Sequence, residues 1–224
     1  MASVVEVWRY PVKSMAGERL DSCEVAPTGL VGDRRWALVD GSPNRAGKPL
    51  TIREDDQLMA YRARFGRGGV EVVAPGGVVV SVDGQLVSRL AAASSRALTL
   101  RESEGANFDD SPVLLVNLAT VAAFSVEAGM EVDHRRFRAN LYVSGLSPEE
   151  EIGWIGRRVA VGGAELDVVS RCERCVVITK DPDTRATTPE LLRVLTHTQG
   201  TCMGVYCQVA RPGRVAAGDH VHLV

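Results

Sequence analysis

The stretch R-R-V-A-V-G-G-A-E-L-D-V-V-S-R-C-E-R-C, residues 157–175, joins a predicted hairpin directly to two cysteines. Residues 158–161 and 165–169 are predicted strands, and Gly162-Gly163 between them is a typical two-residue turn. The second strand continues into R-C-E-R-C-V-V-I-T-K-D-P-D-T, residues 171–184. The sequence therefore predicts a β-hairpin that leads into a chemically active segment.

Short strands separated by turns dominate the rest of the chain. Further strands are predicted over residues 20–26, 36–39, 70–73, 78–82 and 113–116. Asp83-Gly84 is a strong hairpin turn and predicts another strand over 85–87. Two helices are expected, one over 119–128 ended by Gly129, and one with Thr188 as N-cap and Pro189 at its first position. This pattern predicts a mainly β protein with a few helices, built as a barrel or sandwich.

The length and charge of the chain limit its organisation and its partners. With 224 residues it can bury a full hydrophobic core. The pattern loosens around 91–101, which predicts two domains, 1–95 and 96–224. The 26 basic and 28 acidic residues give a net charge of −2, so global charge gives no reason to expect binding to nucleic acid or an anionic membrane.

Cysteine usage and the N-terminus indicate a cytoplasmic setting. Five cysteines cannot all be paired within one chain. The first residues lack a basic region followed by an apolar stretch, so no secretory signal is expected. No window approaches the ~18 apolar residues of a membrane span. We therefore expect free thiols in a reducing compartment and no membrane-spanning segment.

Cys172 and Cys175 each follow an arginine, and guanidinium groups favour a thiolate that can bind a soft metal or act as a nucleophile. A structural zinc site is not expected, because Cys202 and Cys207 are five residues apart on a predicted strand and would face opposite ways. A thioredoxin-like pair should open a helix, whereas residues 176–179 form a β-branched run. With both cysteines on one strand, only one can serve a given site, and we choose Cys175.

Basic residues gather at three places where strands begin or end. Lys13 and Ser14 follow Pro11, and Arg34 precedes a predicted strand. The third place is a strand predicted over 138–143. Strand alternation there puts Arg136, Arg138 and Asn140 on one face, opposite Phe137 and Leu141. Such groups can bind an oxyanion.

Several longer motifs together resemble a known family. These are R-Y-P-V-K-S at 9–14, G-L-V-G-D-R-R-W at 29–36, R-F-R-A-N-L-Y-V-S-G at 136–145, the cysteine segment, M-G-V-Y at 203–206 and G-R-V-A-A-G-D-H-V at 213–221. They resemble MOSC domain proteins that carry an N-terminal MOSC β-barrel domain, among them the mitochondrial amidoxime-reducing component and its bacterial relatives. The resemblance runs nearly end to end and in the same order.

The resemblance implies an N-terminal β-barrel-like domain packed on a MOSC β-barrel domain, with a molybdenum–pterin cofactor (molybdopterin) held between the two halves of the chain. It implies that Cys175 is the metal ligand and catalytic residue. The cofactor-binding residues of the family correspond to Lys13, Ser14, Arg34, Thr120, Arg138 and Asn140. The implied activity is an oxidoreductase that reduces N-oxygenated, N-hydroxylated compounds with electrons from a separate donor protein.

Two departures and two alternatives accompany this hypothesis. Arg185 stands where relatives usually have glycine after D-P-D-T, and Thr120 replaces what is often serine. The first alternative is a molybdenum cofactor carrier or sulfur-transfer protein with a persulfide on Cys175. The second is a non-catalytic module that presents Lys13, Arg136 and Arg138 to a phosphorylated metabolite.

Overall fold

The computed structural model describes residues 1–45, 47–103 and 107–224, which form two compact units. Unit 1 contains residues 1–8, 19–31 and 109–224, and unit 2 contains residues 9–18 and 32–108. The N-terminal part of the chain thus contributes strands to both units.

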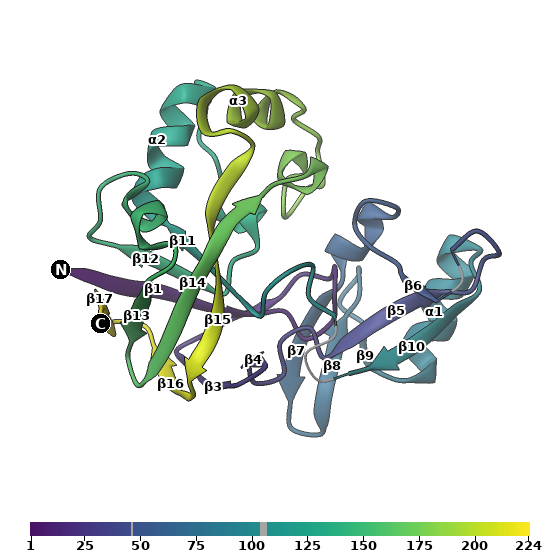
Figure 1. Cartoon of the computed structure of the whole chain (residues 1–224). Helices are drawn as coiled ribbons and strands as arrows, with labels where there is room; N and C mark the ends of the chain where they lie inside the picture. Colours follow the sequence, from purple (N-terminus) through teal and green to yellow (C-terminus); the bar gives the residue numbers. More distant parts are fainter. Residues whose placement is uncertain (46, 104–106) are drawn as a thin grey trace. The chain divides into compact units, whose positions relative to one another are not determined.

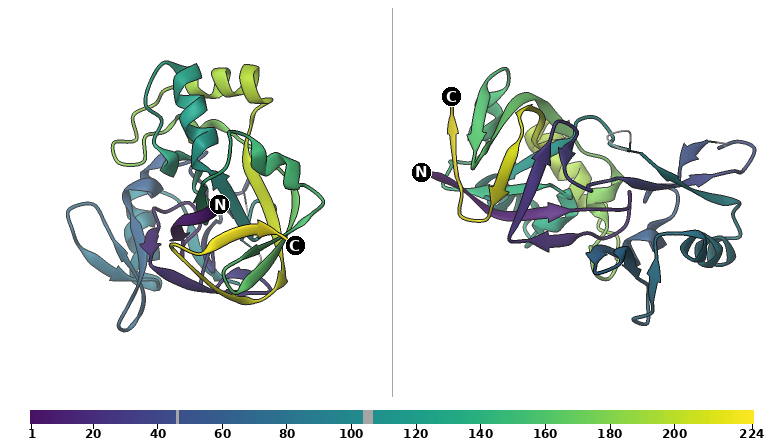
Figure 2. Two further views of the ribbon diagram at one scale, coloured as in Figure 1. Left: turned by 90° about the vertical axis from the view of Figure 1, so that its left-hand side faces the viewer. Right: turned by 90° about the horizontal axis from the view of Figure 1, so that it is seen from below.

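Unit 1 is built on a closed barrel of seven strands. Around the barrel the order is β12, β11, β15, β14, β13, β17 and β1, and the pairing of β1 with β12 closes it. The pair β11–β12 is parallel and the other pairs are antiparallel. Because β1 also pairs with β17, both termini lie on this unit (Figure 2). The barrel strands are β1 Ala2–Arg9, β11 Val113–Asn117, β12 Leu141–Ser144, β13 Arg158–Val161, β14 Ala164–Glu173, β15 Cys202–Arg211 and β17 His220–Leu223.

A small three-stranded sheet completes the strands of unit 1, and a short strand pairs with β1. The small sheet has the order β16, β3, β4. The strands are β2 Glu18–Leu20, which pairs with β1, β3 Ser22–Ala26, β4 Gly29–Leu30 and β16 Gly213–Ala216.

Both faces of the barrel wall are buried along β11. Val113 and Leu115 belong to the apolar core inside the barrel. Leu114 and Val116 belong to a second core, outside the barrel, beneath α2 (Leu118–Ala128) and α3 (Glu190–Gln199). The two helices pack together over β11 and β15 (Figure 1). This burial explains the unbroken apolar run of the strand.

The two helices predicted in the second half of the chain are present. Asn117 caps α2 by accepting a hydrogen bond from the Ala119 N–H at 3.0 Å, and Gly129 ends the helix at φ 64°. Helix α3 begins at Glu190 with Pro189 as its N-cap, one residue later than predicted. The hairpin of β13 and β14 is also confirmed, and it leads to Cys172 at the end of β14.

Gly204 shows why one glycine of the M-G-V-Y motif is required. It lies in β15 at φ 77°, where an added Cβ atom would come within 2.5 Å of the Leu115 carbonyl oxygen and 2.6 Å of Val116 Cγ2. Only glycine combines this backbone conformation with so close an approach of β15 to β11.

Unit 2 contains two three-stranded antiparallel sheets and a helix around its own core. The sheets have the orders β10–β5–β6 and β7–β8–β9. Its core includes Leu38, Leu58 and Leu86. The elements are β5 Trp36–Asp40, β6 Lys48–Pro49, the 3₁₀ helix η1 Asp56–Ala60, β7 Arg62–Gly66, β8 Gly69–Val73, β9 Val79–Ser81, α1 Gly84–Ser94 and β10 Leu98–Glu102.

The hairpin predicted at Asp83-Gly84 was wrong, because these residues begin α1 instead. The Asp83 carboxylate accepts a hydrogen bond from the Gln85 N–H at 2.8 Å, as a helix N-cap does. Leu86 and Leu90, four residues apart, then point into the core. An aspartate before a glycine is compatible with both a hairpin turn and a helix N-terminus. Burial of Leu86 and Leu90 stabilises the helix.

The prediction of a mainly β protein with a few helices is confirmed. Within the described ranges, none of the helices has both the length and the apolar character needed to cross a membrane.

Candidate functional site

Cys175 lies where the barrel strand β14 gives way to a short 3₁₀ helix. β14 ends at Glu173, and Cys175 is the N-cap of η4 (Val176–Thr179) with extended backbone angles. The side chain is half-buried, and its sulfur has no hydrogen-bond partner among the described residues. All five cysteines are free thiols. Cys175 is therefore both accessible and unpaired, as a ligand to an incoming metal must be.

The β-branched run after Cys175 was predicted as a continuing strand, and this was wrong. Residues Val176–Thr179 turn as η4, and Ile178 is buried against the helical layer. Cys172 lies in β14 and belongs to that same layer, with 1% of its surface exposed. The two cysteines differ in environment because one is in a strand and the other at a helix cap, not because of strand alternation.

Arg174 connects Cys172 to the segment that precedes Arg138. The sequence analysis did not include Arg174 among the site residues. Its Nη1 donates to Cys172 Sγ at 2.8 Å, and its Nη2 donates to the Phe137 carbonyl at 2.5 Å. The guanidinium also lies over the Phe137 ring, 5.4 Å from its centroid. Burial works against its charge, but Cys172 and Tyr206 beside it raise the pKa of Arg174 above its ordinary value. The position of Arg174 between Cys172 and Cys175 in the sequence was the signal that could have identified it as a site residue.

The strand predicted over 138–143 starts later than expected, and the residues before it, 134–137, are a 3₁₀ turn. They form η2 (His134–Phe137), which Asp133 caps by accepting a hydrogen bond from the Arg135 N–H at 2.8 Å, and Arg138 follows at φ 52°. Strand β12 starts only at Leu141. The expected shared face of Arg136, Arg138 and Asn140 is therefore wrong, since alternation does not apply to a 3₁₀ turn.

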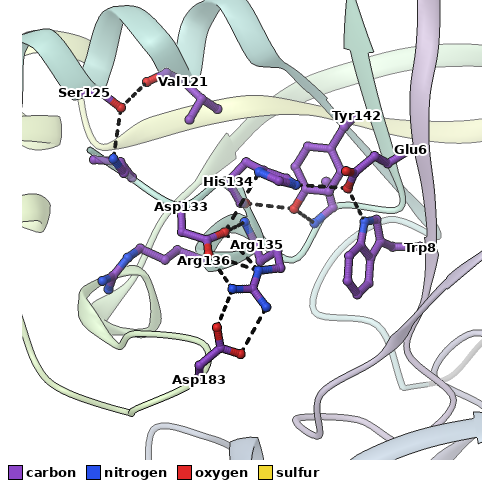
Figure 3. Close-up of polar contacts among 12 residues, drawn as sticks. Glu6, Trp8, Val121, Ser125, Asp133, His134, Arg135, Arg136, Tyr142 and Asp183 are labelled. Atoms are coloured by element: carbon purple, nitrogen blue, oxygen red, sulfur yellow. Dashed lines mark hydrogen bonds and ion pairs between the residues drawn. The ribbon is translucent and has the colours of Figure 1, made fainter. Parts of the chain in front are cut away.

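Arg135 and Arg136 hold the loop that follows η4. Arg135 makes a bidentate pair with Asp183, at 3.1 and 2.6 Å, while also binding Asp133 (Figure 3). Arg136 is buried, and it donates to the Ile178 carbonyl at 3.3 Å and to the Asp181 carboxylate at 3.1 Å. Through these contacts Arg135 and Arg136 fix the D-P-D-T loop. The contacts do not leave the two arginines exposed for a phosphorylated ligand.

The Asp181 carboxylate organises the same loop from within. It accepts hydrogen bonds from the N–H groups of Asp183 at 3.1 Å and Thr184 at 2.8 Å, and from the Thr184 hydroxyl at 2.9 Å. The hydrogen bond from the Thr184 N–H is the main reason why the pKa of Asp181 lies below its ordinary value. Arg185 closes the loop at φ 64°, a conformation that glycine adopts without strain.

Replacing Arg136 with methionine is expected to loosen this loop. The substitution removes charge-assisted hydrogen bonds to Ile178 and Asp181, each typically contributing ~1.5–3 kcal/mol. Amide exchange at Asp183 and Thr184, measured by hydrogen–deuterium exchange, should accelerate about tenfold or more. Arg158→Met, which removes an exposed pair with Asp167 on the barrel wall, is the control. Equal exchange in the two variants would show that Arg136 does not hold the loop.

A cluster around Glu6 fixes η2 to strand β1. Trp8 Nε1 donates to Glu6 Oε2 at 2.6 Å, and His134 Nε2 lies 3.0 Å from the same oxygen (Figure 3). The Tyr142 hydroxyl donates to the His134 carbonyl at 2.8 Å. Burial opposes the charge of Glu6, but the bonds from Trp8 and His134 keep the pKa of this carboxyl below its ordinary value. The segment that precedes Arg138 is thus held in place from two strands.

Arg138 and Asn140 follow this cluster directly. Asn140 is buried, and it accepts a hydrogen bond from the Leu114 N–H at 3.2 Å and donates to the Trp8 carbonyl at 3.3 Å. It therefore links β1 to β11. The Phe137 carbonyl that precedes Arg138 is bound by Arg174, which precedes Cys175. Unit 1 thus places Arg138 and Cys175 on neighbouring segments, and the cofactor roles of Arg138 and Asn140 stay predictions.

Thr120 lies in a buried polar network around Glu151. Its hydroxyl donates to the Glu151 carboxylate at 2.9 and 3.1 Å and accepts from the Glu149 N–H at 2.8 Å. Asn117 Nδ2 donates to the same carboxylate at 3.0 Å. Glu151 belongs to the 3₁₀ helix η3 (Glu150–Trp154). The cofactor role of Thr120 stays a prediction, and the observed contacts give it a structural role.

Glu151 makes the stability of unit 1 depend on pH. Burial raises the pKa of this carboxyl above 4.5. The folded state therefore keeps the proton that the unfolded state loses, and stability falls as pH rises from about 4.5 through the raised value. Glu151→Gln should remove this fall in stability. In chemical unfolding experiments, the free energy of unfolding of the variant should therefore rise relative to that of the parent protein as pH increases. Glu127→Gln, at an exposed position on α2, is the control, and a parallel pH profile for both variants would contradict the assignment.

Unit 2 brings together Lys13, Ser14 and Arg34. The Lys13 N–H donates to the Trp36 carbonyl and the Arg34 N–H to the Tyr10 carbonyl, both at 2.8 Å, so segments 10–14 and 33–36 run side by side. Lys13 Nζ donates to the Asn107 carbonyl at 2.7 Å. Lys13 and Ser14 are nearly buried, with 9% and 7% exposed.

Asp33 and Asn107 support this cluster, and the sequence analysis did not single them out. The buried Asp33 carboxylate accepts a hydrogen bond from the Tyr10 N–H at 2.7 Å and pairs with the Arg34 guanidinium. Asn107 Nδ2 donates to the Arg34 carbonyl at 3.0 Å. Asp33 lies inside the G-D-R-R-W motif, which was the available signal. Lys13 and Arg34 are therefore fixed at adjacent positions.

Three of the predicted cofactor residues have left-handed backbone conformations. Ser14, Arg34 and Arg138 have φ values of 71°, 48° and 52°. Non-glycine residues are uncommon in this region, and they concentrate at functional sites, where the surrounding structure holds them. In unit 1 the half-buried thiol of Cys175 suits a soft metal, and in unit 2 the basic side chain of Arg34 suits an anionic group. Among the described residues, no cluster of three or more His, Cys, Asp or Glu side chains could bind a metal by itself.

Known proteins resemble this chain over nearly all of its length. The molybdenum cofactor sulfurase of Caenorhabditis elegans is 28% identical over 235 residues, covering 91% of this chain and 33% of that protein. The mitochondrial amidoxime reducing component 2 of Bos taurus is 22% identical, covering 99% of this chain and 83% of that protein. The chain thus spans about a third of the length of the sulfurases from two Caenorhabditis species.

A solved structure and two family models agree on the fold. The crystal structure of the YuaD protein from Bacillus subtilis superposes with a TM-score of 0.56 at 17% identity, covering 99% of this chain and 94% of that one. The model of the MOSC domain matches residues 101–222, and the model of the MOSC N-terminal beta barrel domain matches residues 1–117. The chain therefore belongs to the MOSC domain family, with a MOSC N-terminal β-barrel domain preceding the MOSC domain.

Proposed function

We propose that this protein binds a molybdenum–pterin cofactor through Cys175 and reduces N-oxygenated small molecules. The observation that supports this most is the half-buried Cys175 thiol without a hydrogen-bond partner among the described residues, at a helix cap beside the Arg138 segment. Cys202 is also partly exposed, but it lies within strand β15. Cys175 is the thiol whose local structure suits metal ligation best.

Cationic side chains suit the anionic part of such a cofactor. Lys13 and Arg34, which unit 2 holds at adjacent positions, would pair with the phosphate of the pterin. The surrounding structure holds the left-handed backbone at Arg34 and Arg138 in place before the ligand arrives. Preorganised charges lose less entropy on binding, which favours retention of the cofactor.

When bound, the molybdenum centre supplies the redox chemistry that removes an oxygen atom from the substrate. Each turnover consumes two electrons and two protons and releases the oxygen as water. Electrons would come from a separate reductase. The residues of this chain bind and orient the cofactor: Cys175 holds the metal, and the loop fixed by Arg135 and Arg136 holds the segment that follows it. The names of the amidoxime-reducing relatives support this class of substrate.

A turnover assay tests the proposal. Full-length protein from cells supplied with molybdate is mixed with reduced methyl viologen and benzhydroxamic acid, and benzamide is measured by chromatography. We expect benzamide formation that is absent from protein prepared in tungstate. Protein that carries molybdenum and pterin but forms neither benzamide from benzhydroxamic acid nor benzamidine from benzamidoxime would contradict the reductase assignment.

The second candidate is a carrier or sulfur-transfer protein, and the sulfurase relatives favour it. In that case Cys175 would bear a persulfide in place of the metal. Mass spectrometry of the intact chain distinguishes the two candidates. One extra sulfur atom on Cys175, without pterin, supports the carrier, whereas a bound pterin and an unmodified cysteine support the reductase.

A further inference from the structure

A surface pocket of about 350 Å³ lies between η4 and α3, directly after Cys175 in the chain. Its volume falls in the range of small-molecule sites, roughly 300–1,000 Å³. Helix α3 packs against η4, and the segment between them contributes Thr187 and Pro189 to the lining. Helix α3 and the turn before it are seen in Figure 1. The pocket is lined by Val176, Thr179, Thr187, Pro189, Leu192, Arg193, Thr196 and His197.

Helix α3 has one face in the core and another on this pocket. Leu191, Leu195 and Gln199, spaced by four residues, form the buried face. The pocket residues of the helix region follow a second stripe, with the i, i+3, i+4, i+7, i+8 spacing of one helix face: Pro189, Leu192, Arg193, Thr196 and His197. A helix that packs on one side and lines a hollow on the other has a surface available for a ligand.

The threonine hydroxyls that line the pocket are largely used by the protein. Thr179 donates to the Val176 carbonyl at 2.7 Å, and Thr196 donates to the Leu192 carbonyl at 2.8 Å. Thr187 accepts a hydrogen bond from Lys180 at 2.9 Å. With these hydroxyl groups engaged, the threonines offer mainly their methyl groups. Together with Val176 and Leu192 they make the pocket wall apolar.

Two basic side chains remain at the rim, one helical turn apart. The His197 imidazole has no hydrogen-bond or ion-pair partner in the part of the chain that the structure describes. Arg193 pairs with Glu190 at 3.1 Å, but both side chains are largely exposed, 71% and 60%. An exposed pair of this kind contributes little and can exchange for a ligand. No acidic side chain is found among the described residues that line the pocket.

We propose that this pocket binds a small molecule with an apolar, ring-sized body and an anionic group. The body would lie against Val176, Leu192 and the threonine methyl groups. The anionic group would meet Arg193 and His197. A cationic ligand is disfavoured, because it would place like charge beside Arg193 with no carboxylate in the lining. The inference does not depend on molybdenum binding, since every residue that carries it lies outside the predicted cofactor set.

Calorimetric titration of the full-length chain with 2-naphthoate tests the site, with 2-naphthamide as the neutral analogue. Thr196→Trp fills the pocket from an exposed helix position, and Thr198→Trp adds the same side chain outside the lining. We expect Thr196→Trp to weaken naphthoate binding about tenfold or more, and Thr198→Trp to leave it unchanged. Equal thermal stability of the two variants shows that both are folded.

The charge requirement has its own test. Arg193→Gln should weaken 2-naphthoate about fivefold but leave 2-naphthamide unaffected. Arg89→Gln, an exposed arginine on α1, removes the same charge elsewhere and should change neither. Three results would overturn the proposal: no naphthoate binding at millimolar concentration, equal binding by the two tryptophan variants, or equal loss in the two arginine variants. None of them bears on whether Cys175 holds a metal, which metal analysis reports separately.

Discussion

Protein with Cys175 replaced by alanine is expected to contain at least about tenfold less molybdenum than the parent chain when both are purified from cells supplied with molybdate. Substitution of groups that only support a metal ligand already reduces affinity about 10- to 100-fold, and loss of the ligand itself should cost no less. Cys175 has no hydrogen-bond partner among the described residues, so its removal leaves no buried group unpaired. The fold should therefore be retained.

Cys202→Ala is the matched control for this experiment. Cys202 is a half-buried thiol of the same unit, located in β15, where burial raises the pKa of the thiol above its ordinary value. It should keep the molybdenum content of the parent chain. Equal molybdenum in the Cys175→Ala variant and the parent would exclude Cys175 as the ligand, whatever the activity of the protein.

Gly204→Ala is expected to destabilise the barrel of unit 1 strongly. A methyl group would meet the Leu115 carbonyl and Val116 at 2.5 and 2.6 Å, in a backbone conformation with φ 77°. The left-handed conformation costs roughly 1–2 kcal/mol, and overpacking adds typically 1–3 kcal/mol. We expect a total loss of about 3 kcal/mol or more in the free energy of unfolding.

The conformational and steric costs can be separated with a second glycine. Gly129 ends α2 at φ 64° and has nothing within 4 Å of an added Cβ atom. Gly129→Ala should therefore lose only the conformational part, about 1 kcal/mol. Unfolding can be followed by tryptophan fluorescence with Trp36 replaced by phenylalanine, which leaves the signal of Trp8 and Trp154 in unit 1. Equal losses in the two variants would show that β15 can move away from β11.

The parts of the fold that follow local patterns were predictable from the sequence. The hairpin that leads to Cys172 follows from strand alternation and a glycine pair, and α2 follows from its apolar residues and Gly129. The mainly β architecture follows from many short strands. Each of these signals lies within a few residues of the element it specifies.

The elements around the site were less predictable, because distant contacts determine them. The β-branched run after Cys175 and the residues before Arg138 form 3₁₀ turns. The two turns are held together by Arg136, bound to the Ile178 carbonyl, and by Arg174, bound to the Phe137 carbonyl. These pairs are separated by about forty positions in the chain. Local propensity carries no information about such pairs.

The candidate site shows the same division. Cys175 and the basic residues could be chosen from residue type and motif. The roles of their buried partners were not predicted: Asp33 and Arg174 carried a sequence signal that did not reveal their contacts, and Asn107 carried none, because these roles depend on contacts across the fold. Thr120 shows the opposite case, in which a motif position is found bonded to a buried glutamate, Glu151.

The molybdenum-to-protein and pterin-to-protein ratios of the purified full-length chain, made with molybdate supplied, test the central claim most directly. The proposed function predicts about one metal atom and one pterin per chain, with an unmodified thiol at position 175. A preparation from cofactor-producing cells that contains neither metal nor pterin, while position 175 carries an additional sulfur atom, would contradict it.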